Sequence, residues 1–151
     1  MNDEISGLPT RRAALRLLDA VMRMGTPMDQ ATANATKGLS PPDRALAIAI
    51  AQETLRWSVD LDVLIDSKTK QPLPDDAKAR AVLRLALAQI LRLGTPPHAV
   101  IATALPLVDK GPRRLVHGVL GSLLRGEEPD PDRLDPVRYG DWELKGVAVD
   151  F

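Results

Sequence analysis

The chain has 151 residues, of which 20 are lysine or arginine and 20 are aspartate or glutamate, and it contains no cysteine. This length suits a single domain with its own hydrophobic core, and the missing cysteines exclude disulfides, thiolate metal sites and cysteine nucleophiles. The start lacks the apolar region of a signal peptide and no apolar run approaches the ~20 residues of a membrane span, so we expect a cytoplasmic protein without membrane contact.

Two helices are expected in the first forty residues. Thr10 is a candidate N-cap, and the apolar residues that follow it recur at helical spacing, which predicts a helix over residues 10–24. The run Gly25-Thr26-Pro27 then interrupts this pattern. A shorter segment rich in alanine and threonine predicts a second helix from residue 28 to about residue 37.

The middle of the chain predicts two more helices and a loop. Ser40 and Pro41 form an N-cap and first-turn pair that opens a third helix, which we expect to end at Trp57. A fourth, short helix is expected over residues 60–67, and the proline-containing stretch 68–74 predicts a loop. Trp57 is expected in the core, because the other aromatic residues all lie near the C-terminus.

Three further helices complete the expected bundle. Residues 77–93 are apolar nearly all round, so this helix is predicted to lie at the centre. Another helix is expected over residues 97–109, with a kink or an early end at Pro106, because an internal proline removes a backbone hydrogen bond. The last helix is expected to run from Pro112 to about residue 126. No strand pattern occurs along these segments, so we predict an all-α bundle of about seven helices.

Charge divides the chain into two segments. Residues 1–125 hold 17 basic against 12 acidic residues, a net charge of +5, whereas residues 126–151 hold 3 against 8, a net charge of −5. The charged stretch after residue 126 contains prolines and cannot bury enough apolar area to order itself. We therefore predict a helical domain over residues 1–126, followed by an acidic linker and an extended C-terminal peptide over residues 127–151.

Four short runs carry a resemblance to a known family. They are Arg11 to Leu18, Leu39-Ser40 with Asp43 to Leu46, Lys78 to Leu85, and Pro96 to Val100. In these runs the chain resembles the NusB-like family, and most closely the N-terminal RNA-binding domain of RsmB-type ribosomal RNA cytosine methyltransferases, over residues 10–125. The resemblance implies an all-α fold of two packed bundles that binds ribosomal RNA or its leader transcript, and no DNA. For NusB itself it implies transcription antitermination together with a ribosomal protein.

The residues argue against catalysis. The sequence has no glycine-rich nucleotide loop and no cysteine for attack on a cytosine base, so we predict a protein that is not an enzyme and needs no cofactor. The two histidines, His98 and His117, lie far apart and predict no metal site. Ala102-Thr103 and Pro106 depart from the family pattern. These departures leave open that the chain is a decayed remnant of a methyltransferase RNA-binding domain.

Arginines of the first helix and of the central helix are the candidates for RNA contact. On the first helix they lie opposite the apolar stripe, with Asp19 among them. A planar guanidinium matches phosphate oxygens, whereas a merely solvated face is the alternative. On the central helix the alternative is that the side-chain stems only cover apolar neighbours. The predicted RNA-binding residues are Arg11, Arg12, Arg16, Arg23, Arg80 and Arg84.

The C-terminal peptide has a resemblance of its own. The runs Arg138 to Glu143 and Asp150-Phe151 resemble the C-terminal signature of the small succinate dehydrogenase assembly factor family, although Val147 stands at a position that is usually basic there. The resemblance implies contact with a respiratory flavoprotein subunit, which makes a protein-interaction factor the alternative function. The predicted partner-binding residues of this peptide are Arg138, Tyr139, Asp141, Trp142, Glu143 and Phe151.

Overall fold

A computed structural model describes residues 5–125, and in this range the chain forms seven α-helices, one short 3-10 helix and no β-strand. The all-α prediction is confirmed, while the predicted extended tail lies outside the described residues. No helix between residues 5 and 125 is long and apolar enough to span a membrane. The elements in chain order are α1 Leu8–Met22, α2 Met28–Ala35, α3 Pro41–Arg56, α4 Ser58–Asp66, α5 Lys78–Leu91, α6 Pro97–Ala104, η1 Leu105–Leu107 and α7 Lys110–Leu124.

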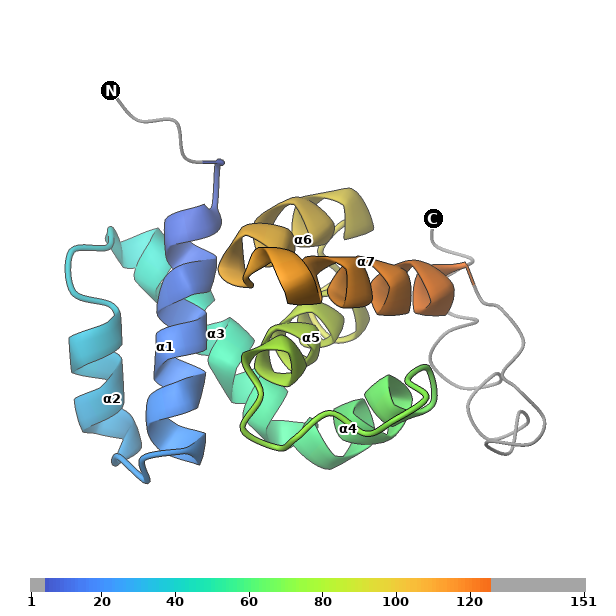
Figure 1. The fold of residues 1–151 in the computed structure, drawn as a ribbon. Helices are drawn as coiled ribbons and strands as arrows, with labels where there is room; N and C mark the ends of the chain where they lie inside the picture. Colours follow the sequence, from blue (N-terminus) through green and yellow to red (C-terminus); the bar gives the residue numbers. More distant parts are fainter. Residues whose placement is uncertain (1–4, 126–151) are drawn as a thin grey trace.

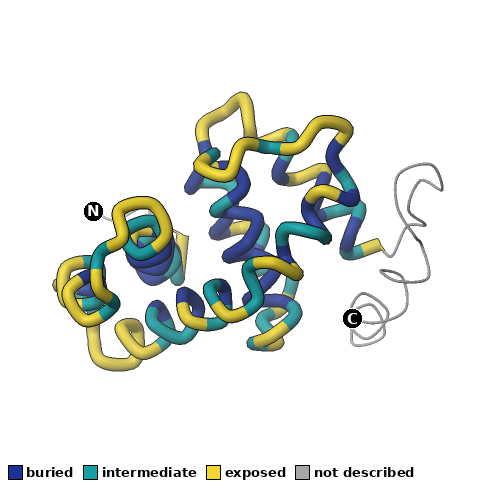
Figure 2. The backbone as a smooth tube through the Cα atoms, turned by 90° about the horizontal axis from the view of Figure 1, so that it is seen from below, coloured by how far each residue is buried: buried dark blue, intermediate teal, exposed yellow. Residues whose placement is uncertain are grey.

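Helix α5 lies at the centre of the fold (Figure 1) and packs against α1, α3, α4, α6 and α7. Every residue from Val82 to Ile90 is buried, and the helix is dark blue along most of its length in Figure 2. This burial confirms the central position that the all-round apolar pattern predicts. Helix α1 packs on α2 and α3 on one side of α5.

One continuous apolar core joins six of the helices. It contains buried residues of α1, α3, α4, α5, α6 and α7, with Leu83, Leu87 and Leu120 among the side chains that are almost fully excluded from water. A small second cluster of Leu17, Ala31 and Ala51 attaches α2 to α1 and α3. Because Ala31 is the one buried residue of α2, this helix covers the bundle without adding much to its core.

Proline and glycine set several of the helix ends. Helix α1 starts at Leu8 and not at the predicted Thr10, because Gly7 adopts a positive φ of 83° and Pro9 fits the first turn, where no backbone N–H is needed. The predicted Ser40 cap is present, since its side chain accepts a hydrogen bond from the backbone N–H of Asp43. Pro106 ends α6 early and leaves the 3-10 turn η1, as the sequence predicts.

Trp57 lies at the junction of α3 and α4 and is partly buried against the core. The guanidinium carbon of Arg92 lies 4.4 Å from the centroid of its ring. This cation–π contact shields one face of the indole, and Glu53 holds Arg92 from the other side through a 3.5 Å contact. The tryptophan therefore closes α3, as predicted, but within a partly exposed cluster.

Candidate nucleic-acid interface

A cleft of about 1010 Å³ lies between α1 on one side and the start of α5 with η1 on the other. Its apolar lining residues include Leu15 and Leu18 of α1 and Ala81 of α5. The basic residues that line it are Arg12, Arg16, Arg23, Lys78 and Arg84. The acidic residues that line it are Asp19, Asp62, Asp75 and Asp76. The cleft therefore carries both signs of charge, with only a small excess of positive charge.

The arginines of α1 that line the cleft differ in how strongly they are engaged. Arg16 is exposed, and its side chain makes no hydrogen bond or ion pair with any residue between 5 and 125. Arg23 is also exposed and pairs with Asp19 one turn earlier, at 3.2 Å from its Oδ1. Such a surface pair contributes at most about 1 kcal/mol, so a phosphate group can compete for Arg23. Arg12 is partly buried at the cleft wall.

Arg11 is separated from this group. Its Nε donates a 2.9 Å hydrogen bond to Oε1 of Gln89 on α5, and its guanidinium packs close to Gly7. Burial lowers the pKa of the Arg11 guanidinium, against the opposing influence of Asp43. Arg11 does not line the cleft, and it ties α1 to the central helix. Its contact with RNA stays a prediction, which this geometry argues against.

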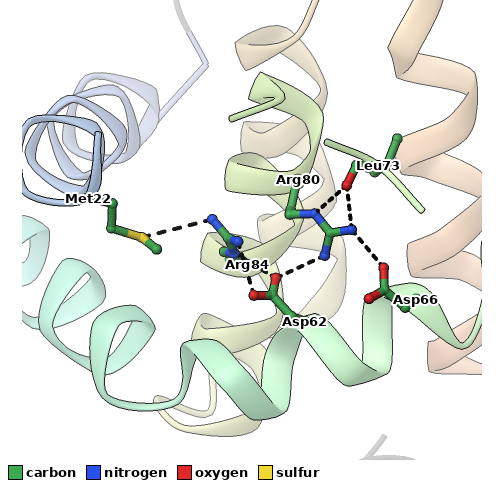
Figure 3. A network of polar contacts seen from close by, with 6 residues as sticks. All are labelled: Met22, Asp62, Asp66, Leu73, Arg80 and Arg84. Carbon is green, nitrogen blue, oxygen red and sulfur yellow. Dashed lines mark hydrogen bonds and ion pairs between the residues drawn. The ribbon is translucent and has the colours of Figure 1, made fainter. Parts of the chain in front are cut away.

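Arg80 and Arg84 form an internal network with α4 (Figure 3). The guanidinium of Arg80 donates to Oδ1 of Asp62 at 3.0 Å, to Oδ1 of Asp66 at 2.7 Å and twice to the backbone oxygen of Leu73. Arg84 donates hydrogen bonds to both carboxylate oxygens of Asp62, from Nε to Oδ1 at 2.7 Å and from Nη2 to Oδ2 at 3.0 Å. Burial alone would lower the pKa of Arg80, but the hydrogen bonds that its guanidinium donates to Asp66 and Asp62 raise this pKa above its ordinary value.

This geometry argues against the prediction that Arg80 and Arg84 contact RNA. Their side chains are only 3% and 6% exposed, and their donors already point at carboxylates and a carbonyl. The network fastens α5 to α4 and to the loop that follows it. Lys78 takes their place as the α5 candidate, because it is exposed and lines the cleft.

Two further predictions are placed by the structure. The two histidines are both exposed, His98 near the start of α6 and His117 on α7. Between residues 5 and 125 no group of three histidine, aspartate or glutamate side chains is arranged to hold a metal ion. The six predicted partner-binding residues of the C-terminal peptide, Arg138 to Phe151, lie outside the described residues.

Comparison with known proteins gives two family matches. One, described as NusB family, covers residues 8–125, and the other, described as a protein of unknown function (DUF1674), covers residues 125–151. The ribosomal RNA small subunit methyltransferase B of Xanthomonas campestris pv. campestris is 30% identical over 150 residues, which are 97% of this chain and 34% of that protein. The protein of the same name from Pseudomonas putida is 28% identical over 134 residues, which are 84% of this chain and 31% of that protein.

The chain thus spans about a third of the length of the curated relatives it matches. No solved structure matches it.

Proposed function

The chain belongs to the NusB family, and we propose that it is a non-catalytic module that binds ribosomal RNA through the cleft between α1 and α5. The name of its relatives, ribosomal RNA small subunit methyltransferase B, supports the class of nucleic acid. The observation that carries the proposal is the exposed Arg16, which stands in the cleft with no partner among the described residues.

The cleft residues favour contact with the RNA backbone. A guanidinium presents a planar fork of donors that matches phosphate oxygens. Arg16 on α1 and Arg23 at its C-cap present two such groups about two turns apart. Asp19, Asp75 and Asp76 lower the potential of the cleft, so binding is of modest affinity and sensitive to salt.

The lining of the cleft has no aromatic side chain on which an RNA base could stack. Sequence-specific binding of single-stranded RNA relies on exposed aromatic side chains, and the cleft lining contains none. Trp57, the aromatic residue within the described part of the chain, packs under Arg92 instead. The module therefore reads shape and charge more than sequence.

The proposed absence of catalysis rests on the residues. The chain has no cysteine to attack a cytosine base, and it matches only about a third of each relative. Methyl transfer by the relatives is therefore not carried over to this chain. Transcription antitermination and a ribosomal protein partner, implied by the resemblance alone, stay predictions.

An Arg16→Ala variant tests the proposal. We expect its affinity for a ribosomal RNA fragment to fall about tenfold, which corresponds to ~1.4 kcal/mol, because one charge-assisted phosphate contact is lost. The slope of log K against log salt should also shrink by about 0.7 to 0.9. Fluorescence anisotropy over a series of salt concentrations measures both quantities.

Arg44→Ala is the matched control, since Arg44 is exposed at the start of α3 and does not line the cleft. Equal affinities for the two variants would contradict the proposed cleft. If the wild-type chain binds no ribosomal RNA at low salt, the decayed-remnant alternative replaces the proposal.

A second candidate function concerns the C-terminal peptide. Its separate family match over residues 125–151 supports a segment with its own role, although the description of that family gives no function. We propose that this segment binds a protein partner, and the flavoprotein subunit of succinate dehydrogenase is the partner to test.

The full chain should be captured by the immobilised flavoprotein subunit, and Tyr139→Ala/Trp142→Ala should abolish the capture, because aromatic side chains dominate such contacts. Lys145→Ala serves as the control within the same peptide. Equal recovery of the double variant and the wild type would rule out binding through these aromatic residues.

A further inference from the structure

Helix α7 carries a second positively charged surface, which we name the α7 face and define by Lys110, Arg114, His117 and Arg125. All four side chains are exposed, and at about 100° per residue they fall within an arc of roughly 80°. The opposite side of the helix is apolar, and its valines and leucines are buried against α5. The α7 face therefore looks toward solvent along the full length of the helix.

The α7 face lacks the acidic residues that the cleft contains. Residues 110–125 include no aspartate or glutamate, and the nearest acidic residues along the chain are Asp109, at the N-cap, and Glu127, two residues after Arg125. Lys110 and Arg114 make no hydrogen bond or ion pair with residues 5–125. Their charges are thus uncompensated within the described structure, unlike those of Arg23, Arg80 and Arg84.

The fold fastens the start of the α7 face to the wall of the cleft. Nε of Arg113 donates hydrogen bonds of 3.0 Å to the backbone oxygens of Leu105 and Val108, which pins the first turn of α7 to η1. Pro106 and Leu107 of η1 line the cleft opposite α1. In Figure 1, α7 continues from this point across α5. Lys110 and Arg114 therefore lie in the first turns of the helix that follows η1 in the chain.

Gly121 leaves room for the side chain of Arg125 at the far end of the α7 face. The guanidinium of Arg125 folds back over Gly121, where an added Cβ would lie 2.9 Å from Nη1. The charge of Arg125 is thereby kept close to the helix, about one turn from its own Cα. Together with Lys110 it extends the α7 face over a helix of 15 residues, about 22 Å.

We propose that the α7 face is a second contact surface for RNA phosphates, continuous with the cleft. This inference rests on the proposed function, because it extends the same RNA path. A long polyanion that follows the chain of exposed cations from α1 past η1 to α7 uses both surfaces. An acidic peptide would need only one of them, so the continuity favours RNA as the occupant.

The test uses the full chain with Lys110→Ala/Arg114→Ala and two ribosomal RNA fragments. One has about 6 nucleotides, near the short end of single-stranded site sizes, and one has about 20, beyond their long end. We expect the double variant to bind the long fragment about tenfold more weakly, and the salt slope to shrink by about 1.5, because two phosphate contacts are lost. Binding of the short fragment should stay unchanged, because the cleft alone holds it.

The control is Lys37→Ala/Arg44→Ala, which removes two exposed cations outside both surfaces. Thermal unfolding by circular dichroism should be unchanged in both double variants, since none of these four side chains is buried. If Arg16→Ala weakens binding but the α7 double variant matches its control, the inference is overturned and the proposed function stands. Binding of a peptide of residues 127–151 that depends on Lys110 and Arg114, with RNA binding unchanged, would also overturn it. If the wild-type chain binds neither RNA fragment, both the inference and the proposed function are overturned.

Discussion

Replacing Asp62 by alanine is expected to lower the free energy of unfolding by about 3 kcal/mol. In the wild type this carboxylate accepts hydrogen bonds from both Arg80 and Arg84. Without it Arg84 keeps no carboxylate partner within residues 5–125, while its side chain is only 6% exposed. An unpaired buried charge is costly, because the protein interior solvates it poorly. The estimate lies at the low end of the usual range, since Asp62 itself is 28% exposed.

Two further variants test whether the loss of stability comes from the unpaired charge of Arg84. Asp60→Asn removes an exposed aspartate of the same helix and should change stability by less than about 0.5 kcal/mol. Adding Arg84→Met to Asp62→Ala should restore part of the loss, because the methionine removes the unpaired charge and keeps most of the volume. Urea denaturation of the four chains measures these differences. If Asp62→Ala unfolds like Asp60→Asn, water reaches Arg84 and the network contributes little.

The helices could be predicted from the sequence because their signals are local. Apolar spacing, the Ser40 cap and the interruption at Pro106 act over a few residues, and the structure shows each of them. The start of α1 was misplaced because Thr10 resembles a cap, whereas Pro9 is tolerated in the first turn and lets the helix begin at Leu8. Local rules therefore predicted the elements well and their ends to within a few residues.

The candidate site could be predicted only where it depends on a single helix. Arg12, Arg16 and Arg23 share one side of α1 by helical periodicity, and the structure places all three at the cleft. The burial of Arg80 and Arg84 could not be predicted without knowing which helix packs against α5 at that point. Asp62 and Asp66 are also one turn apart, but nothing in the sequence shows that these two helices face each other.

Arg11 and Lys78 illustrate the same limit. Arg11 is next to Arg12 in the chain, so it points about 100° away around the helix, and there it meets Gln89. Lys78 is two residues before Arg80 and so points to a different side of α5, which the fold turns toward the cleft. Which partner a given side of a helix meets is decided by packing between elements, and the local sequence pattern does not show it.

Truncating Leu83 to alanine is expected to destabilise the protein by about 2 to 5 kcal/mol. Leu83 is fully buried on α5, the helix that contacts five others, so the lost methyl groups leave a cavity that its rigid neighbours cannot fill. Val59→Ala on α4 is the control, because that valine is 75% exposed and its truncation opens no cavity. Thermal or urea unfolding provides the comparison.

The shape of the unfolding transition of Leu83→Ala tests whether the helices unfold together. The continuous core joins α1, α3, α4, α6 and α7 around α5. We therefore expect one cooperative unfolding transition, with its midpoint at a lower denaturant concentration and its steepness unchanged. Two separate transitions would show that the helices on either side of α5 unfold independently. In that case the cleft would lie between two separately stable units, and the geometry that aligns Arg16 with Lys78 would depend on their contact.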